Sequence, residues 1–593
     1  MLKDIMDRQQ RELQICLIKE VQNYMEKVLK IKLIAGTILI CAVCTWLGLT
    51  LLNKYKPSET MRTLDNYYDV GPEEAVVLLE NEIYAERALV RDGGIYLTLD
   101  TIGSLINDGF YFDEAEQLLS YTLPEELIRI EPGKSYYYSN KEKKEVSSPV
   151  FLDLNGVYYL SLDFVKMVSN MTYAFYENPN RRVIHYQWSD FLYYDTIEDN
   201  TPVRVEPDIK SDILRLVPAG EKLYYIGGTG KGSRSFFKVM TQDGIYGYVQ
   251  KKFLGESYYD ALQSAYTEPE YTHITMDEKV KLGWQLVTVP KANNNLESLA
   301  ERAKEMNVIS PTWYRLIDTE GSISSLADAD YVQRAHELGL QVWPLIDNFE
   351  KDVSTYDLLS SSAARDVLID NMMAEAEIYG FDGWNIDFES LASSTGPHYV
   401  QFLKELSVRC RQEGIVLSVD VPAFYNGSYD LETQGKVVDY VIIMAYDEHY
   451  SGSKEAGSVA SLGFLKKAIN NTLKKMPKER IVMAIPFYTR LWWTEQTANG
   501  ETKLSSKAYG MDEAKEILAN NKVTAQYDEA SGQNYAEYKK DGITYKIWME
   551  DMHSLHERLK VIAEADVAGM AAWHLGFGNK EAWPVIEAYM NAD

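Results

Sequence analysis

Two carboxylic acids and an amide alternate with apolar residues in the segment 384–389. Asn385, Asp387 and Glu389 take every second position, and Trp, Ile and Phe take the positions before them. Successive side chains of a β-strand point to opposite faces, so the pattern predicts a strand with one apolar and one acidic face. Because a buried carboxyl is costly unless it is paired or used, such acids point to acid catalysis with a shifted pKa. The alternative is that they cap the next helix or pair with lysines.

The elements that must position these acids begin near residue 273, where strand and helix patterns start to alternate. Eight strands are predicted, at 281–287, 308–316, 340–346, 383–389, 416–421, 440–446, 481–488 and 569–575. Helix-like segments fall between most of them, which predicts a parallel (β/α)8 barrel over 273–593. The last two strands are separated by a long polar, tyrosine-rich segment at about 490–562, which predicts a small α+β insertion. Catalytic side chains of such barrels lie at the carboxyl ends of the strands.

The segment 382–389 also resembles the active-site strand of glycoside hydrolase family 18, whose pattern reads Asp-Gly-x-(Asp/Asn)-x-Asp-x-Glu. Asn385 takes the Asp/Asn slot of this pattern. Other predicted strand ends carry matching motifs, namely Met-Ala-Tyr-Asp at 444–447, Pro-Phe-Tyr at 486–488 with Arg490, and Ala-Trp-x-Leu-Gly at 572–576. The arrangement is similar to the chitinase-like and spore-cortex or wall-lytic N-acetylglucosaminidase branch of that family.

The resemblance implies substrate-assisted retaining hydrolysis, in which the substrate's own acetamido oxygen attacks the anomeric carbon. Glu389 is expected to protonate the glycosidic oxygen and then to act as base for water. Asp387 is expected to orient the acetamido group and to stabilise the positive charge that forms. Asn385 is expected to donate a hydrogen bond to Asp387, and Tyr446 to the acetamido carbonyl.

Further residues are expected to bind the sugar or to support the site. Trp573 is expected to stack its apolar face on the sugar ring, with barrel-end packing as the alternative. The remaining predicted substrate-binding residues are Met444, Asp447 and Arg490, and Asp382 is expected to be structural. The implied chemistry needs no cofactor and no metal, and His449 and His574 lie on different strands without a metal-ligand spacing.

An apolar segment near the N-terminus predicts a membrane anchor. Residues 33–52 contain no charged residue, which is long enough for a helix to cross a bilayer. Lysines flank the segment on both sides, and most acids of this chain (net charge −28) follow it. The positive-inside rule therefore predicts a cytoplasmic segment at 1–30, a transmembrane helix at 31–52, a stalk at 53–63 and an extracellular remainder. A cleaved signal peptide is the alternative. The acidic exterior argues against a nucleic-acid partner.

Two regions separate the stalk from the barrel. Residues 64–197 contain a repeat, because Tyr-Leu-Thr-Leu-Asp at 96–100 recurs as Tyr-Leu-Ser-Leu-Asp at 159–163. This predicts a duplicated α+β domain that resembles the N-terminal domain of copper amine oxidases, without implying copper. Residues 200–255 predict short strands between Gly-rich turns, and Gly-Tyr-Val at 247–249 resembles the closing strand of a bacterial SH3-like wall-binding barrel.

The predicted fold class is therefore α/β. It combines a TIM barrel and its insertion with an SH3-like all-β domain, a duplicated α+β domain and one transmembrane helix. The predicted function is a glycosidase, anchored in the cell membrane at the bacterial wall, that acts on N-acetylglucosamine-containing glycans. Peptidoglycan is favoured, and chitin or chitooligosaccharide is the close alternative. Two other hypotheses stay open, a non-hydrolytic sugar-binding protein on the same barrel and a wall tether that binds through residues 64–255.

Overall fold

The computed structural model describes residues 1–591 except 66, 80–81, 178–181, 187–189, 229–234, 262–264, 426 and 497–501. The chain divides into two compact units, one comprising 1–97 with 165–266 and the other comprising 98–164 with 267–593. The barrel and the small segment 98–164 thus share one unit.

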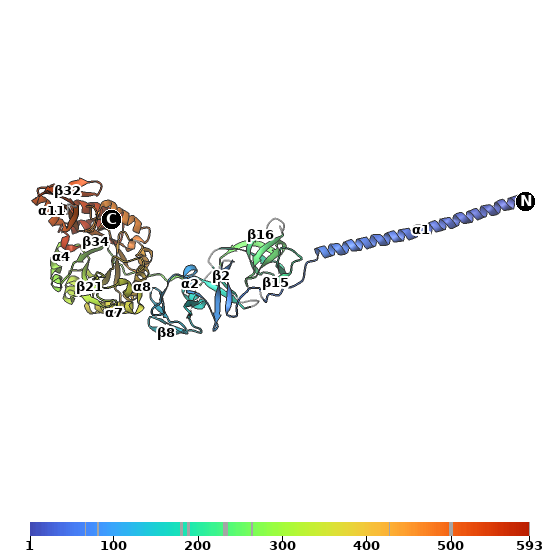
Figure 1. Ribbon diagram of the computed structural model, residues 1–593, viewed down its shortest axis with the longest axis horizontal. Helices are drawn as coiled ribbons and strands as arrows, with labels where there is room; N and C mark the ends of the chain where they lie inside the picture. Colours follow the sequence, from blue (N-terminus) through green and yellow to red (C-terminus); the bar gives the residue numbers. More distant parts are fainter. Residues whose placement is uncertain are drawn as a thin grey trace. The chain divides into compact units, whose positions relative to one another are not determined.

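A single uninterrupted helix, α1 (Leu2–Tyr55), begins the first unit and is blue in Figure 1. It contains both the predicted cytoplasmic segment and the predicted membrane segment. The helix is long and apolar enough to cross a membrane, and it buries no residue within the protein. The apolar side chains of α1 are exposed, and a membrane or a protein partner would remove them from water.

The first unit also contains two sheets. One has the order β15-β14-β18-β17-β16-β13-β19, and its antiparallel strands enclose a small aliphatic core. These strands are β13 (Phe191–Thr196), β14 (Thr201–Arg204), β15 (Ile213–Val217), β16 (Lys222–Gly228), β17 (Phe236–Met240), β18 (Tyr246–Gln250) and β19 (Leu254–Asp260). The other sheet contains β1 (Glu74–Leu79), β2 (Glu82–Arg91), β3 (Gly94–Thr98), β11 (Thr172–Tyr176) and β12 (Arg182–Tyr186).

Residues 98–164 fold as a small module of the second unit. Its centre is an antiparallel meander of β4 (Phe110–Asp113), β5 (Leu118–Thr122), β6 (Leu127–Ile130), β7 (Tyr136–Ser139) and β8 (Glu142–Glu145). A hairpin of β9 (Phe151–Leu154) and β10 (Val157–Ser161) follows. Each copy of the sequence repeat passes from a strand into a short helix, α2 (Leu99–Leu105) or α3 (Leu162–Val168). The meander between the two copies has no counterpart among the elements predicted from the sequence.

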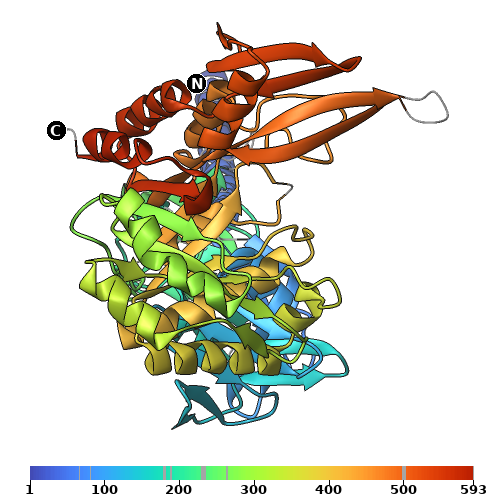
Figure 2. The same cartoon turned by 90° about the vertical axis from the view of Figure 1, so that its left-hand side faces the viewer.

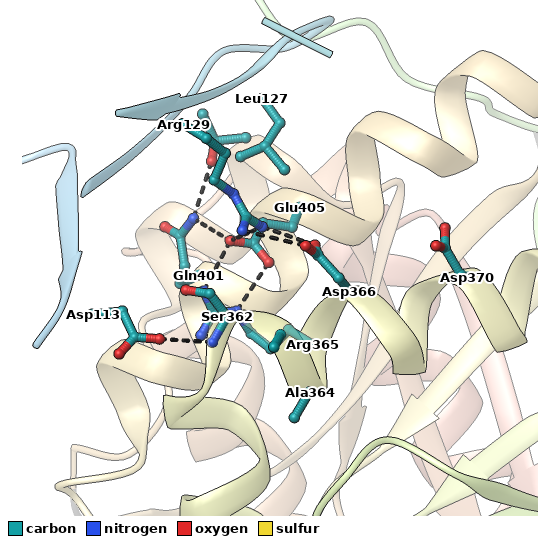
Figure 3. Close-up of polar contacts among 12 residues, drawn as sticks. Asp113, Leu127, Arg129, Ser362, Ala364, Arg365, Asp366, Asp370, Gln401 and Glu405 are labelled. Carbon is teal, nitrogen blue, oxygen red and sulfur yellow. Dashed lines mark hydrogen bonds and ion pairs between the residues drawn. The ribbon is translucent and has the colours of Figure 1, made fainter. Parts of the chain in front are cut away.

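The module packs on two barrel helices, α7 (Ser362–Tyr379) and α8 (Gly396–Glu413), through polar side chains (Figure 3). A fully buried ion pair joins these helices, because Arg365 Nε donates to Glu405 Oε2 at 2.9 Å. From the module, Arg129 lies 3.4 Å from Glu405, and it donates to Asp366 at 2.8 Å. Asp113 accepts a 2.7 Å hydrogen bond from the Ser362 N–H at the start of α7. The module therefore covers charges that the barrel by itself would leave exposed.

The barrel is a closed ring of eight parallel strands, as the sequence analysis predicts. In ring order they are β20 (Val280–Gln285), β21 (Val308–Leu316), β24 (Leu345–Asp347), β25 (Gly383–Asp387), β26 (Val416–Pro422), β27 (Tyr440–Met444), β28 (Ile481–Pro486) and β34 (Gly569–Trp573). Pairing between β20 and β34 closes the ring. Short strands β22 (Ile323–Ser325) and β23 (Gln341–Val342) pair with β21.

Helices surround this ring and are placed by local signals. They are α4 (Leu296–Arg302), α5 (Ala329–Glu337), α6 (Thr355–Ser360), α7, α8, α9 (Leu431–Val437), α10 (Leu462–Thr472), α12 (Met552–Ala565) and α13 (Ala582–Met590). The Ser361 hydroxyl caps α7 by accepting from the Ala364 N–H at 3.1 Å. Gly380, at φ +67°, ends α7 in the left-handed conformation that favours glycine. The chain then enters β25 within three residues, which delivers the acidic strand directly from a well-capped helix.

A small α+β insertion lies between the last two barrel strands. Its sheet has the order β30-β29-β33-β32-β31, and Figure 2 shows its strands in orange and red beside the barrel. The elements are β29 (Tyr488–Gln496), β30 (Thr502–Gly510), α11 (Met511–Asn520), β31 (Gln526–Asp528), β32 (Gln533–Lys540) and β33 (Ile543–Trp548). The predicted segment 490–562 extends too far, because α12 contributes Leu555, Leu559 and Ile562 to the barrel core.

Candidate active site

The strand β25 has the two faces that its alternation predicts. Trp384 packs in the apolar layer between strands and helices, where its ring lies 4.8 Å from that of Tyr314 and 4.9 Å from that of Phe381. Asn385 and Asp387 point to the barrel interior and are 0% and 4% exposed. Glu389 follows the strand end and is partly exposed. The apolar face thus holds the strand in place while the acidic face is presented at the carboxyl end of the ring.

Strand register brings two further aspartates level with Asp387. Asp347 on β24 is paired directly with Asp387. On the other side, Asn385 is paired with Ser418 and Ile386 with Val419, so the next residues along, Asp387 and Asp420, lie side by side. Neighbouring strands are about 4.8 Å apart. Three carboxyls from three adjacent strands therefore occupy one layer of the barrel.

Asn385 uses its amide fully, but not in the predicted way. Its Oδ1 accepts from Trp284 Nε1 at 2.8 Å and from Ser310 Oγ at 3.3 Å. Its Nδ2 lies 3.3 Å from Ser418 Oγ and donates to Asp420 Oδ1 at 2.8 Å. The predicted hydrogen bond from Asn385 to Asp387 is therefore wrong. The two residues are about 6.6 Å apart along one strand, whereas Asp420 approaches from the neighbouring strand.

The two acids proposed for catalysis, Asp387 and Glu389, both have raised pKa values. Burial, then the neighbouring carboxyls of Asp420, Glu389 and Asp347, raise the pKa of Asp387 well above its ordinary value. Its Oδ1 is buried and meets no hydrogen-bond partner in the described parts of the chain. Burial, then Asp447 and Asp347, raise the pKa of Glu389 to about 7. A carboxyl with such a pKa carries a proton at slightly acidic pH, which a general acid requires.

Neighbouring loops fix the backbone at Glu389. The Asn348 side chain accepts from the Glu389 N–H at 2.9 Å and donates to the Glu389 carbonyl at 3.0 Å. The Tyr429 hydroxyl donates to the Phe388 carbonyl at 2.7 Å. Asp347 receives two hydrogen bonds from Arg315, at 2.6 and 3.0 Å, so its charge is balanced. These contacts leave the Glu389 carboxyl itself as the group that projects from the rigid strand end.

The motif after β27 lies beside the same acids. Burial, then Asp420, Asp387, Tyr488 and Glu389, raise the pKa of Tyr446 well above its ordinary value, so its hydroxyl remains a neutral donor. Met444 ends the strand and is 7% exposed. Asp447 is exposed and accepts from the Tyr488 hydroxyl at 2.5 Å.

The other predicted sugar contacts come from neighbouring strands. Trp573 ends β34, is partly exposed, and packs edge-on against Trp284 with ring centroids 5.7 Å apart. Arg490 lies on β29 of the insertion and donates to Ser506 at 3.2 Å. Strand β29 follows β28 directly in the chain, so Arg490 lies on the β28 side of the insertion. The ring therefore brings the predicted residues to its carboxyl end from β25, β27, β34 and the insertion.

Several side chains singled out by the sequence lie elsewhere or have local partners. Asp382 is at the opposite end of β25, where it accepts from the Val342 N–H at 2.8 Å and lies 2.9 Å from His336. His449 bonds the Ser458 carbonyl at 3.0 Å. Burial lowers the pKa of His574 to about 4, so it is neutral.

Asp420 and Asp347 are the site residues that sequence reasoning missed. Both had a usable signal, because Ser418 and Asp420 alternate with valines in a predicted strand, and Asp347 directly follows another. A polar residue on the inward face of a buried strand marks a candidate site in the same way as the pattern at 385–389. The missing information was the register between the strands.

Comparisons with known proteins agree with the resemblance. Residues 332–578 match the model of glycosyl hydrolases family 18, and residues 199–255 match the bacterial SH3 domain. The chain is 27% identical over 243 residues to the cortical fragment-lytic enzyme of Bacillus subtilis (strain 168), covering 40% of this chain and 56% of that protein. It is 25% identical over 286 residues to "Putative sporulation-specific glycosylase YdhD" of the same strain, covering 47% of this chain and 63% of that protein.

The chain thus spans less than two thirds of the length of these two relatives. Among solved structures, the Bacillus cereus spore cortex-lytic enzyme SleL is 20% identical, with a TM-score of 0.48, and the match covers 57% of this chain and 78% of that one. The two domain matches confirm the predicted resemblance for the barrel and for the SH3-like region.

Proposed function

We propose that this chain, whose barrel is a glycosyl hydrolase family 18 domain, is a membrane-anchored glycosidase that cleaves β-linked N-acetylglucosamine-containing glycans. One observation supports this activity most strongly. Glu389 projects from the end of β25 with a pKa of about 7, two residues beyond a buried Asp387 whose Oδ1 has no partner among the described residues. A buried, unpartnered carboxyl oxygen is costly unless a ligand completes its hydrogen bonds.

The proposed reaction uses these two carboxyls in turn. Glu389 donates its proton to the glycosidic oxygen as the bond to the leaving sugar breaks. The acetamido oxygen of the substrate bonds to the anomeric carbon, while Asp387 accepts the acetamido N–H and stabilises the positive charge. The Glu389 carboxylate then takes a proton from a water molecule whose oxygen bonds to the anomeric carbon, while the bond from that carbon to the acetamido oxygen breaks and its electron pair returns to the acetamido group. The two inversions retain the anomeric configuration, and the acid is restored.

Other residues support this reaction without taking part in proton transfer. The neutral Tyr446 hydroxyl donates to the acetamido carbonyl, and the Trp573 ring carries the apolar face of the sugar. Met444, Asp447 and Arg490 line the neighbouring surface. None of these steps requires a cofactor or a metal ion.

Peptidoglycan is the polymer that we favour. The SH3 domain and the apolar helix α1 would hold the barrel close to a cell wall, with the N-terminus in the cytoplasm and residues 53–593 outside. Two relatives support the choice, because their names refer to the lysis of cortical fragments and to a sporulation-specific glycosylase. Chitin is the alternative, since its sugars carry the same acetamido group.

The decisive experiment uses the whole chain in detergent micelles. Wild type and Glu389→Gln are incubated with purified peptidoglycan and with chitin, and soluble reducing ends are measured. Release from peptidoglycan that is lost in the variant supports the proposal. Release from chitin alone changes the substrate, and binding without release from either polymer favours the sugar-binding alternative.

Anchoring and orientation need a separate measurement. The full chain should fractionate with membranes, and a version lacking residues 1–56 should not. Protease added outside intact cells should digest the SH3 domain. A soluble full chain, or protection of that domain from external protease, would contradict the proposed topology.

A further inference from the structure

The three carboxyls of the layer, Asp347, Asp387 and Asp420, differ in the hydrogen-bond donors that they receive. Asp347 receives two hydrogen bonds from Arg315, at 2.6 and 3.0 Å. Asp420 receives one from Asn385 Nδ2, at 2.8 Å. Asp387 is 4% exposed, and its Oδ1 has no partner in the parts of the chain that are described. The middle carboxyl therefore has one buried oxygen without a hydrogen-bond donor among the described residues.

Unlike Asp347, neither Asp387 nor Asp420 forms an ion pair with a basic side chain among the described residues. They occupy equivalent positions on adjacent parallel strands, so their side chains point into the barrel about 4.8 Å apart at the backbone. Asp420 is 1% exposed. Both carboxyls are buried on adjacent strands, and each raises the cost of charge on the other, so ionising both is strongly disfavoured. A pair of this kind keeps one proton between them.

We propose, on the basis of the glycosidase function above, that Asp420 is a positioning residue that shares one proton with Asp387 and keeps that proton when Asp387 turns to the substrate. In the free protein the proton lies between the two carboxyls. When the acetamido N–H arrives, Asp387 accepts it as a carboxylate, and the proton stays on an oxygen of Asp420. The pair holds one proton and one negative charge before and after the step, so no proton enters from solvent.

Asn385 fits this role because it is locked. Trp284 and Ser310 donate to its Oδ1, which forces its Nδ2 toward Asp420. The amide donates to Asp420 Oδ1 alone, so the shared proton is assigned to the other oxygen, Oδ2. The proton-sharing carboxyl thus stands on β26, while β25 contributes a neutral amide.

The surroundings of the pair contain several other titratable groups. They are Asp347 with its partner Arg315, Glu389 and Asp447, and the tyrosines Tyr399, Tyr429, Tyr446 and Tyr488. Burial raises the pKa of each of these tyrosines, so they stay neutral through the physiological range. Arg315, the cation paired with Asp347 in this layer, is already bound, and the balancing charge of the other two carboxyls is assigned to the proton.

Three variants of the full chain test this role. Asp420→Asn removes the second carboxyl with little change of shape, and the double variant Asn385→Asp/Asp420→Asn moves that carboxyl to β25 while keeping an amide opposite it. Asp382→Asn is the matched control, because it removes an acid from the far end of the same strand. A fluorogenic N-acetylglucosamine oligosaccharide serves as substrate, and kcat and KM are measured across the pH range.

We expect Asp420→Asn to lower kcat roughly 10- to 100-fold, with KM changed less than about threefold. In the plot of kcat against pH, the acid limb of this variant should move to higher pH. A single buried carboxyl holds its proton more tightly than two carboxyls that share one negative charge. The double variant should recover most of the lost activity and the wild-type acid limb. Wild-type kcat in Asp420→Asn, an unmoved acid limb, or a double variant no better than the single one would each overturn the role.

A second readout does not depend on turnover. Infrared titrations of Glu389→Gln with and without Asp420→Asn are compared, so that other carboxyls cancel in the difference. Glu389→Gln should keep one carboxyl of the pair protonated between about pH 5 and 8. In Glu389→Gln/Asp420→Asn, the remaining carboxyl of Asp387 should lose its proton within that range. Equal behaviour overturns proton sharing. If the wild type cleaves no glycan, the proposed function fails, while this titration still decides whether the pair shares a proton.

Discussion

Replacing Glu389 by Gln should make the protein more stable at alkaline pH while it abolishes the proton donor. Burial, then Asp447 and Asp347, raise the pKa of Glu389 to about 7, compared with an ordinary value of 4.5. Glutamine has nearly the same shape but no charge at any pH. The variant therefore removes the cost of holding a negative charge in this position and leaves the packing almost unchanged.

The size of the effect follows from the two pKa values. Each pKa unit corresponds to about 1.36 kcal/mol, so the ionised Glu389 costs the folded state about 3 kcal/mol at high pH. Between the unfolded pKa near 4.5 and the folded pKa near 7, the folded chain holds more protons than the unfolded chain. The stability of the wild type therefore falls as pH rises through this window. Below this pH window, Glu389 is protonated in both the folded and the unfolded chain, so the variant has no stability advantage from the loss of charge.

The assay is urea unfolding of the full chain in detergent at about pH 4.5 and about pH 8. Fluorescence of the buried Trp284, Trp343 and Trp384 reports on the barrel. The stability difference between Glu389→Gln and wild type should grow by about 3 kcal/mol toward high pH. Activity should fall by at least about 10²-fold, as expected for the loss of a general acid.

Glu377→Gln is the matched control, because Glu377 is an exposed side chain on α7. Its stability difference should be the same at both pH values. A difference for Glu389→Gln that stays constant with pH would refute the raised pKa. Unchanged activity in that variant would refute its role as the acid.

Three further changes have expected results. Asp447→Asn removes the largest neighbouring charge that raises the pKa of Glu389, so the basic limb of kcat/KM should move to lower pH by up to about one unit. Tyr446→Phe removes the proposed donor to the acetamido carbonyl, so kcat should fall about 10²-fold at unchanged stability. Glu405→Gln leaves the fully buried Arg365 without a charged partner on α8, so the free energy of unfolding should fall by about 3–5 kcal/mol in urea titrations.

Each of these has a control and a contradicting result. Asp382→Asn should leave the pH profile in place, and a basic limb unmoved in Asp447→Asn would exclude Asp447 as a neighbour of the acid. Full activity in Tyr446→Phe would restrict that side chain to packing. Glu432→Gln breaks an exposed pair with Lys475, at 2.9 Å, and should cost at most about 1 kcal/mol. An equally small effect in Glu405→Gln would mean that the buried pair is not needed.

Much of the barrel and one of the three carboxyls of the acidic layer, Asp387, follow from local sequence. The alternation at 384–389 determines which side chains of β25 face inward, because the side-chain direction of a strand reverses at every residue. Repeated strand and helix patterns likewise predict eight β/α units. The approximate positions of Glu389, Tyr446 and Trp573 then follow, since parallel barrel strands all end at the same rim.

Only the tertiary structure decided which carboxyls are neighbours and what covers the barrel. Asp420 meets Asn385 through the register of β25 against β26, and Arg129 meets Glu405 across 276 residues of sequence. The segment 98–164 joins the barrel through such contacts. Periodicity is a property of consecutive residues, whereas register and docking depend on packing between distant segments. The sequence therefore determined the faces of the strands, and only the fold determined which faces meet.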